Sequence, residues 1–179
     1  ATRGNAAALA ASLGAELRTV PIGEAARVVL GAMGHPSAAG AASVAELVAR
    51  VRASPELGDA SLENVQARLR TLLLMCVANR ERGLVVGTGD LSEKALGWCT
   101  YAGDHIAMYD VNAGVPKTLV QALVRWVATE RAGTWAAGGE AAAAAGLRAA
   151  LGAVLDTPIS PELLPPDAAG AIAQLTESA

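Results

Sequence analysis

The residues best suited to chemistry are concentrated in the segment Gly83–Thr118. Its apolar run, Leu84–Val86, is short enough for a buried parallel strand and breaks into the turn Gly87-Thr88-Gly89-Asp90. Ligands of open α/β sheets bind beyond the carboxyl ends of the strands, so a site is expected at this turn. The glycines on either side of Thr88 are expected to let a ligand approach the backbone closely. Acidic, aromatic, amide and basic side chains follow in the same segment: Glu93, Trp98, Tyr101, Asp104, Asn112 and Lys117.

Helices have to hold this turn in place. Asp90 followed by Glu93 forms a capping-box pattern, which predicts a helix that starts at the turn. The longest predicted helix, Ser61–Arg82, precedes the strand and is predicted to end at Gly83. Its apolar residues recur at a spacing of three to four and predict one buried stripe: Leu62, Val65, Leu69, Leu73 and Cys76.

The remaining chain predicts a helix-rich α/β protein, with a Rossmann-like layer of parallel strands. A second strand is expected at Glu16–Ile22, with Pro21 near its end. Because typical sheets have about five to six strands, part of the sheet is expected to be missing from this chain. Further helices are expected at Asn5–Leu13, at Glu24–Met33, from Ser43 to about Ala53, from Pro116 to about Arg131, through Ala141–Ala145 and around Ala168–Leu175.

Composition narrows the class of protein without selecting an enzyme. The formal net charge is −3, which leaves no basic footprint for nucleic acid. No apolar run approaches the roughly 20 residues that span a bilayer, and no signal-peptide pattern is present. Cys76 and Cys99 form no CxxC pair, so a reduced, cytoplasmic protein is expected. His105 lacks partners for zinc, no His–acid pair is placed to activate Cys99, and His35 is expected to be a loop histidine.

A family resemblance rests on ENVQARLR (Glu63–Arg70), VVGTGDLSE (Val85–Glu93), ALGWCTYAGDH (Ala95–His105) and VNAGVPKTL (Val111–Leu119). In order and spacing these runs resemble the motifs of the NAD synthetases, in particular the synthetase domain of the glutamine-dependent enzymes. The resemblance implies a Rossmann-like layer of the adenine nucleotide alpha-hydrolase (ATP pyrophosphatase) type. It also implies that ATP adenylates the carboxylate of deamido-NAD (nicotinic acid adenine dinucleotide) and that ammonia displaces AMP to give NAD.

The resemblance assigns roles where the motifs match. It implies ATP contacts at Thr88, Lys117 and Arg70 and a possible magnesium ligand at Glu93. Contacts to deamido-NAD are implied for Asn64, Glu93, Trp98, Cys99, Thr100, Tyr101 and Asp104, while no catalytic residue is assigned. ATP as a substrate, Mg²⁺, ammonia derived from glutamine, a glutaminase domain in the full-length enzyme and a homo-oligomer are implied as well. The run TYAGDH is one residue shorter than the family's usual TYGVGDH, so the alignment of Gly103–His105 stays open.

One family motif has no counterpart among residues 1–179. Synthetases of this type use a Ser-Gly-Gly-x-Asp-Ser phosphate loop after the first strand, and the sequence contains no such run. Residues 1–179 are therefore expected to be part of an ATP-pyrophosphatase domain that does not make NAD alone. Two alternatives stay open: a related ATP-pyrophosphatase-fold amidotransferase, such as a GMP synthetase-like protein, and a non-catalytic dinucleotide-binding or dimer-forming module.

Overall fold

The computed structural model describes residues 2–157, and the chain divides into two compact units. The first unit combines the described parts of Ala1–Val20 and Val115–Pro158, and the second contains Pro21–Gly114. The helix predicted around Ala168–Leu175 and most of the Pro-rich stretch before it lie outside the described residues. Among residues 2–157, no helix is both long enough and apolar enough to cross a membrane.

The first unit is helical and packs through small side chains. Helix α1 (Thr2–Leu13) lies against α8 (Ala141–Leu155), and Asn5 donates a hydrogen bond of 3.2 Å to Thr157 Oγ1 beyond the end of α8. Between them in sequence come α6 (Lys117–Trp126), the π-helical turn η3 (Val127–Arg131), α7 (Ala132–Trp135) and the short turn η4 (Ala137–Gly139). The alanine content lets these helices approach closely, and the buried residues are Ala132, Ala136, Ala144, Leu147 and Leu151.

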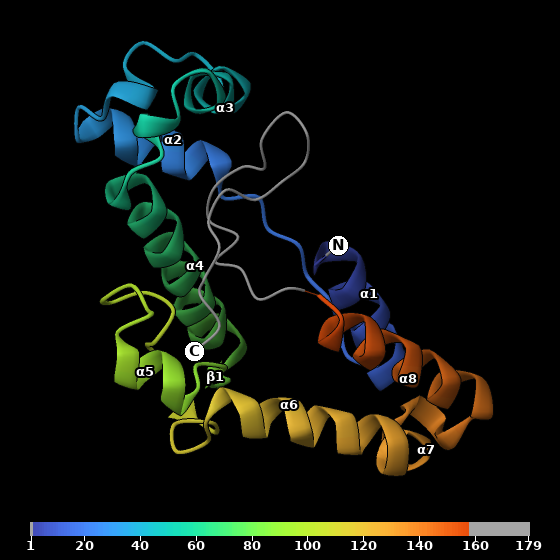
Figure 1. The fold of residues 1–179 in the computed structure, drawn as a ribbon. Coiled ribbons are helices and arrows are strands. Elements are labelled where there is room, and N and C mark those ends of the chain that lie inside the picture. The colour runs from blue at the N-terminus through green and yellow to red at the C-terminus, as the bar shows by residue number, and fades with distance from the viewer. Residues whose placement is uncertain (1, 158–179) are drawn as a thin grey trace. The chain divides into compact units, whose positions relative to one another are not determined.

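The second unit is built around one long helix, α4 (Ala60–Glu81). Helix α2 (Gly23–Ala32) packs against it, and α3 (Val44–Ala53) packs against α2, with the short turns η1 (Pro36–Ala38) and η2 (Pro55–Leu57) between them (Figure 1). The predicted apolar stripe of α4 enters this core at Leu62 and Val65, and Leu69 packs at its edge. Cys76, at the far end of the predicted stripe, is exposed, so the stripe is buried along the N-terminal half of the helix.

Capping decides where the helices of the second unit begin and end. Ser43 Oγ accepts a hydrogen bond from the Glu46 N–H at 3.2 Å, as its position before α3 predicts. Asp59 caps α4, which begins at Ala60, one residue before the predicted start at Ser61. At the other end Arg82, with φ of 54°, takes the left-handed conformation, and the helix ends at Glu81, one residue before the predicted last residue. The Gly83 N–H donates to the carbonyl oxygen of Ala78 at 2.9 Å, closing the last turn.

The strands are shorter than the sequence predicts. Strand β1 (Val86–Gly87) pairs in parallel with β2 (Tyr109–Asp110), which the sequence analysis did not anticipate. The strand predicted at Glu16–Ile22 is wrong, because no described residue pairs with that segment. Within this segment Arg18 Nε donates a hydrogen bond of 2.6 Å to Glu16 Oε1, two residues away.

Candidate functional site

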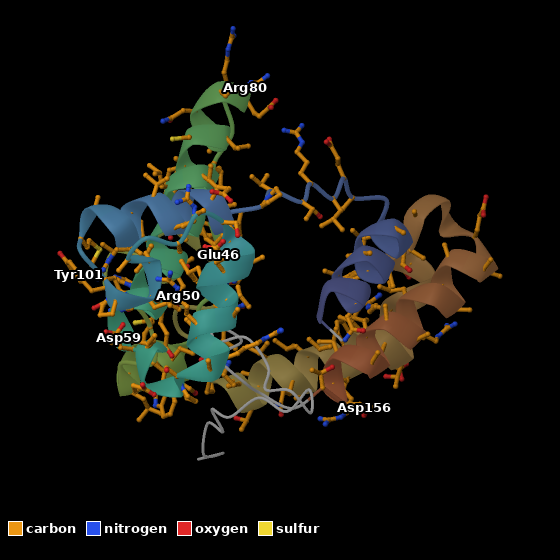
Figure 2. All side chains as sticks on the ribbon, turned by 90° about the horizontal axis from the view of Figure 1, so that it is seen from above. Glu46, Arg50, Asp59, Arg80, Tyr101 and Asp156 are labelled. Atoms are coloured by element: carbon orange, nitrogen blue, oxygen red, sulfur yellow. The ribbon has the colours of Figure 1, made fainter. Side chains whose placement is uncertain are left out.

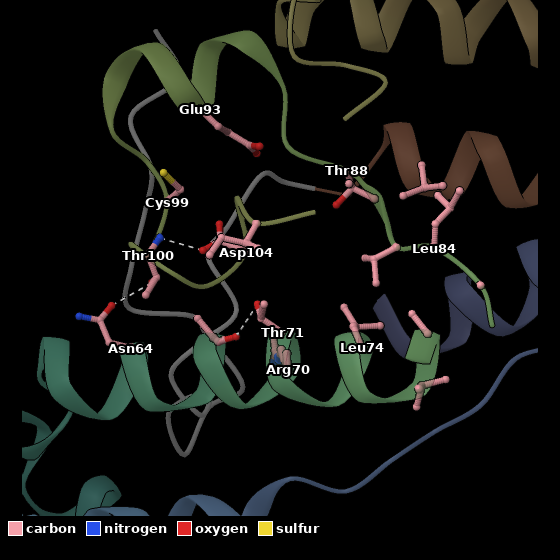
Figure 3. A pocket seen from close by; sticks show the side chains of 18 of the residues that line it. Asn64, Arg70, Thr71, Leu74, Leu84, Thr88, Glu93, Cys99, Thr100 and Asp104 are labelled. Atoms are coloured by element: carbon pink, nitrogen blue, oxygen red, sulfur yellow. Dashed lines mark hydrogen bonds between the residues drawn. The ribbon is translucent and has the colours of Figure 1, made fainter. Parts of the chain in front are cut away.

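A pocket of about 1100 Å³ lies within the second unit, between α4 and the segment from β1 to Ile106 (Figure 3). Its lining includes the carboxyl end of β1, where the chain leaves Gly87 for Thr88, which is the position expected of a ligand site in a parallel sheet. Its lining includes Asn64, Arg70, Thr88, Glu93, Trp98, Cys99, Thr100 and Asp104, all of which carry implied contacts to ATP or deamido-NAD.

Helix α4 supplies one wall of the pocket. The wall follows the helical spacing of three to four residues, which places these side chains on one face: Asn64, Ala67, Thr71, Leu74, Ala78 and Glu81. Sequence reasoning missed most of this face, although the same spacing could have revealed it by counting forward from Asn64. The helix therefore has two distinct faces, an apolar one in the core and a mixed one along the pocket.

The turn after β1 is fixed by the predicted capping box. Asp90 is buried, its carboxylate accepts from the Glu93 N–H at 3.0 Å, and Glu93 Oε2 accepts from the Asp90 N–H at 3.1 Å. These bonds start helix α5 (Leu91–Leu96) and confirm the capping prediction. Glu93 also lines the pocket, so its capping role does not remove it from the site.

Thr100 joins the two walls of the pocket. Its hydroxyl donates to Asn64 Oδ1 on α4 at 2.8 Å, and its backbone N–H donates to Asp104 Oδ1 at 2.7 Å (Figure 3). The carbonyl oxygen of Thr100 accepts from His105 Nδ1 at 2.8 Å. Three predicted site residues are thus linked by hydrogen bonds, and the predicted ligand contact Asn64 is held in place by a second site residue.

Gly97 directs the chain from α5 into the pocket. It ends the helix with φ of 72°, a left-handed conformation that glycine adopts at little cost, and Trp98 and Cys99 follow on the pocket wall. The Trp98 side chain is half exposed, so a flat face remains accessible for stacking. Cys99 is a free thiol.

The structure does not gather every predicted site residue. Tyr101 is 81% exposed and does not line the pocket; its ring lies 5.9 Å from that of His105 (Figure 2). Its carbonyl oxygen accepts a hydrogen bond from Arg68 Nε at 3.1 Å. Lys117 is the first residue of α6, which belongs to the first unit. Its predicted contact with ATP stays a prediction.

Carboxylates outnumber cations in the pocket lining. Glu63, Glu81, Glu93 and Asp104 face a single lining guanidinium, that of Arg70, so the lining has a net negative formal charge. Within the described residues, no group of three or more His, Cys, Asp or Glu side chains could hold a metal ion alone. Mg²⁺ commonly binds through one or two carboxylates, with substrate phosphates and water completing its shell. Glu93 at the pocket wall fits that limited role.

One of the two glycines beside Thr88 is required by the packing of the protein itself. A Cβ at Gly87 would collide with the Asp110 carboxylate and lie 2.8 Å from the Ala107 Cβ. A Cβ at Gly89 would lie 3.6 Å from Lys94 Cε. Lys94 and Asp110 form an ion pair with each other. The missing side chain at Gly87 therefore makes room for the Asp110 carboxylate, whereas a Cβ at Gly89 would be in ordinary van der Waals contact with Lys94. The close approach of a ligand to this backbone stays a prediction.

Comparison with known proteins identifies the family of the chain. The family model described as NAD synthase matches residues 2–132. The chain is 44% identical over 165 residues to the glutamine-dependent NAD(+) synthetase of Mycobacterium bovis and 40% identical over 167 residues to that of Mycobacterium leprae. These matches cover 92% and 93% of the chain and 21% of each relative, so the chain spans about a fifth of their length.

Solved structures agree with the sequence comparison. A glutamine-dependent NAD+ synthetase from Acinetobacter baumannii, in complex with adenosine diphosphate, matches with a TM-score of 0.54 and 28% identity over 70% of this chain and 20% of that one. The enzyme from Cytophaga hutchinsonii matches with a TM-score of 0.58 and 25% identity over 73% of this chain and 20% of its own. The helix-rich unit with a short parallel sheet is part of a Rossmann-like α/β fold. The chain belongs to the NAD synthase family.

Proposed function

We propose that this chain forms part of the synthetase site of a glutamine-dependent NAD synthetase. The reaction proposed is the ATP-dependent amidation of deamido-NAD. The carboxylate of the nicotinate attacks the α-phosphorus of ATP and releases pyrophosphate, and ammonia then attacks the acyl carbon and releases AMP. The observation that carries the proposal is the pocket beyond β1, where most of the implied contacts meet.

The pocket suits the nicotinate end of the dinucleotide. Trp98 offers a flat aromatic face on which a pyridine ring can stack. Asn64 and Thr100 are already hydrogen-bonded to each other, so their positions are set before a ligand arrives. A preorganised site spends less free energy on ordering its side chains when the ligand binds. We assign deamido-NAD contacts to Asn64, Glu93, Trp98, Cys99, Thr100 and Asp104.

The negative lining makes ATP binding dependent on cations. A polyphosphate placed near four carboxylates is repelled unless its charge is offset. Glu93 would hold Mg²⁺, which offsets the phosphate charge when bound. Arg70 and Thr88 are the proposed ATP contacts within the pocket, and Lys117 is the proposed contact from α6. We infer that ATP binds this chain poorly when magnesium is withheld.

The test measures binding of deamido-NAD and of ATP, each with and without Mg²⁺, to the purified chain by isothermal titration calorimetry. We expect dissociation constants between high micromolar and millimolar, about −4 to −6 kcal/mol. Trp98→Ala removes a stacking contact worth about 0.5–1.5 kcal/mol and should weaken deamido-NAD binding by roughly 2- to 12-fold. Glu93→Gln should abolish the gain in ATP affinity that Mg²⁺ gives to the unsubstituted chain.

A matched control separates these effects from general damage. Glu24→Gln removes the charge of the exposed Glu24, which pairs with Arg27 on α2 outside the pocket lining, and should leave both affinities unchanged. Incubation with deamido-NAD, ATP, Mg²⁺ and ammonia should yield no NAD from this chain alone, because its sequence holds no Ser-Gly-Gly-x-Asp-Ser run to cradle pyrophosphate. Equal deamido-NAD affinity of Trp98→Ala and the unsubstituted chain would refute the proposed site.

A further inference from the structure

An ion pair spans the turn that carries Thr88. Lys94 lies on α5 and Asp110 on β2, and the Nζ of Lys94 contacts Oδ2 of Asp110. Both side chains are mostly covered, at 30% and 19% exposure. The pair therefore connects α5, which follows the turn, to β2, which pairs with the strand β1 before the turn.

Gly87 shows how closely Asp110 of the pair fits against the turn. Asp110 lies opposite Gly87 in the parallel register, and its carboxylate occupies the space where a Cβ of Gly87 would be. The Lys94 stem passes beside Gly89, 3.6 Å from where that residue's Cβ would be. Thr88 is thus the one residue of Gly87–Gly89 with a side chain, and the ion pair contacts the turn on both sides of it, closely at Gly87 and at ordinary van der Waals distance at Gly89.

Backbone hydrogen bonds alone hold this region weakly. The sheet consists of short strands in a single register, Val86 with Tyr109 and Gly87 with Asp110. The helix α5 has 6 residues, below the length at which a helix is stable in isolation. A partly buried ion pair that links the two elements adds a constraint that neither supplies alone, and partial burial protects it from screening by salt.

We propose that the Lys94–Asp110 pair is a positioning element that fixes the Gly87–Asp90 turn and so sets the Thr88 and Glu93 side chains at the pocket wall. The ligand contacts that it prepares are those to ATP and Mg²⁺, and this part of the inference rests on the proposed function. Lys94 and Asp110 act on the site through the turn and do not touch the substrate. The sequence motif alone would not separate this role from a direct phosphate contact by Lys94.

The first experiment needs no ligand. Amide hydrogen exchange, followed by NMR, reports how often the turn opens, and the Asp90 N–H is the reporter because it is bonded to Glu93. Lys94→Met and Asp110→Asn should each speed exchange at Asp90 by roughly 5- to 30-fold, and the double variant by no more than either alone. Lys94→Arg keeps the cation and should stay near the unsubstituted rate. Amides in the buried part of α4, such as that of Val65, should not change.

The second experiment measures the affinity for Mg²⁺ and ATP with the same variants. A positioning pair predicts that Lys94→Met and Asp110→Asn weaken binding alike and without additivity, while Glu24→Gln has no effect. Weakening by Lys94→Met together with unchanged or tighter binding by Asp110→Asn would overturn the proposal, because Lys94 would then contact the ligand. Unchanged exchange at Asp90 in both single variants would also overturn it. Absence of ATP binding by the unsubstituted chain would refute the proposed function instead, and the exchange result would still decide the role of the pair.

If Lys94→Met fails to fold, the comparison of Asp110→Asn with Lys94→Arg replaces it. Asp110→Asn keeps the shape that fits over Gly87 and removes the charge, while Lys94→Arg keeps the charge and changes the shape. Faster exchange at Asp90 in Asp110→Asn alone supports the ion pair. Equal exchange in both variants contradicts it.

Discussion

His35 shows how one side chain can join distant parts of the second unit. The imidazole is buried, with 6% of its side chain exposed, and Nδ1 accepts from the Ser37 N–H at 3.2 Å. Because Nδ1 accepts, the ring proton lies on Nε2, which donates to Asp59 Oδ1 at 3.1 Å. The sequence predicted only a loop histidine. The structure gives it a definite role, which is to attach the loop after α2 to the start of the pocket helix α4.

Replacing His35 by leucine should destabilise the second unit. Leucine fills similar space but leaves the fully buried Ser37 without its acceptor and removes the contact to Asp59. An unsatisfied buried polar group costs about 1–3 kcal/mol, so the free energy of unfolding should fall by that amount in urea denaturation. His35→Asn retains an acceptor near the position of Nδ1 and should lose less. A loss no larger than that of the surface control Glu24→Gln, about 0.5 kcal/mol at most, would contradict this role.

At the scale of elements, the N-terminus of α4 depends on one carboxylate. The Leu62 N–H donates to Asp59 Oδ1 at 3.0 Å, and this bond holds the pKa of Asp59 below its ordinary value of 3.8. The hydrogen bond from His35 lowers the pKa further, while partial burial opposes both effects. The folded chain therefore favours the ionised carboxylate more than the unfolded chain does.

The direction of the pH effect follows from that difference. A carboxylate with a lowered pKa in the folded state stabilises the fold fully above its unfolded pKa, and this contribution is lost as pH falls through the folded pKa. Asp59→Asn removes the charge, so its Tm should lie below that of the unsubstituted chain at about pH 7 and approach it at about pH 3. Thermal unfolding followed by circular dichroism measures the Tm of the variant and of the unsubstituted chain at each pH. A Tm difference that stays constant between the two conditions would show that the charge of Asp59 contributes nothing.

The spacing of neighbouring residues was sufficient to predict the helix caps. The strands depend on contacts between distant segments and could not be predicted in this way. Ser43 and Asp90 cap their helices as their spacing to Glu46 and Glu93 predicts, because those hydrogen bonds involve neighbouring residues. The strand predicted at Glu16–Ile22 needed a partner from elsewhere, and none of the described residues provides one. Strand β2 was missed for the same reason, since Tyr109-Asp110 is too short to show an alternation and is defined by its pairing with β1.

The same distinction between local signals and distant contacts explains which residues of the candidate site could be predicted. Thr88, Glu93 and Trp98 could be predicted because motif and turn chemistry mark them in the sequence. The apolar part of the lining could not be predicted in the same way, because Leu74 of α4 and Leu84 before β1 reach the same pocket only in the folded chain (Figure 3). The ion pair of Lys94 with Asp110 joins residues 16 positions apart, and nothing in either motif indicates their contact.

At the scale of the whole molecule, α4 has more apolar surface than the described chain covers. Leu72 is 57% exposed, Leu74 54% and Val77 39%, all in the C-terminal half of the helix. Leu74 and Val77 line the pocket, whereas Leu72 does not. An apolar residue exposed beside a ligand pocket is a candidate for burial in an assembly, and the family resemblance implies a homo-oligomer.

We therefore expect the chain to self-associate through the part of α4 around Leu72. Sedimentation velocity across micromolar concentrations should show dimers or larger species whose fraction rises with protein concentration. Leu72→Glu places a charge on this surface, where burial in an interface would be costly, and should shift the population towards monomer without changing the Tm of the monomer. Arg80→Glu is the matched control: it changes the charge of an exposed side chain near the end of the same helix (Figure 2) and should leave association unchanged. A chain that sediments as a monomer at every concentration, or an Arg80→Glu variant that dissociates as readily as Leu72→Glu, would mean that the exposed leucine does not form the interface.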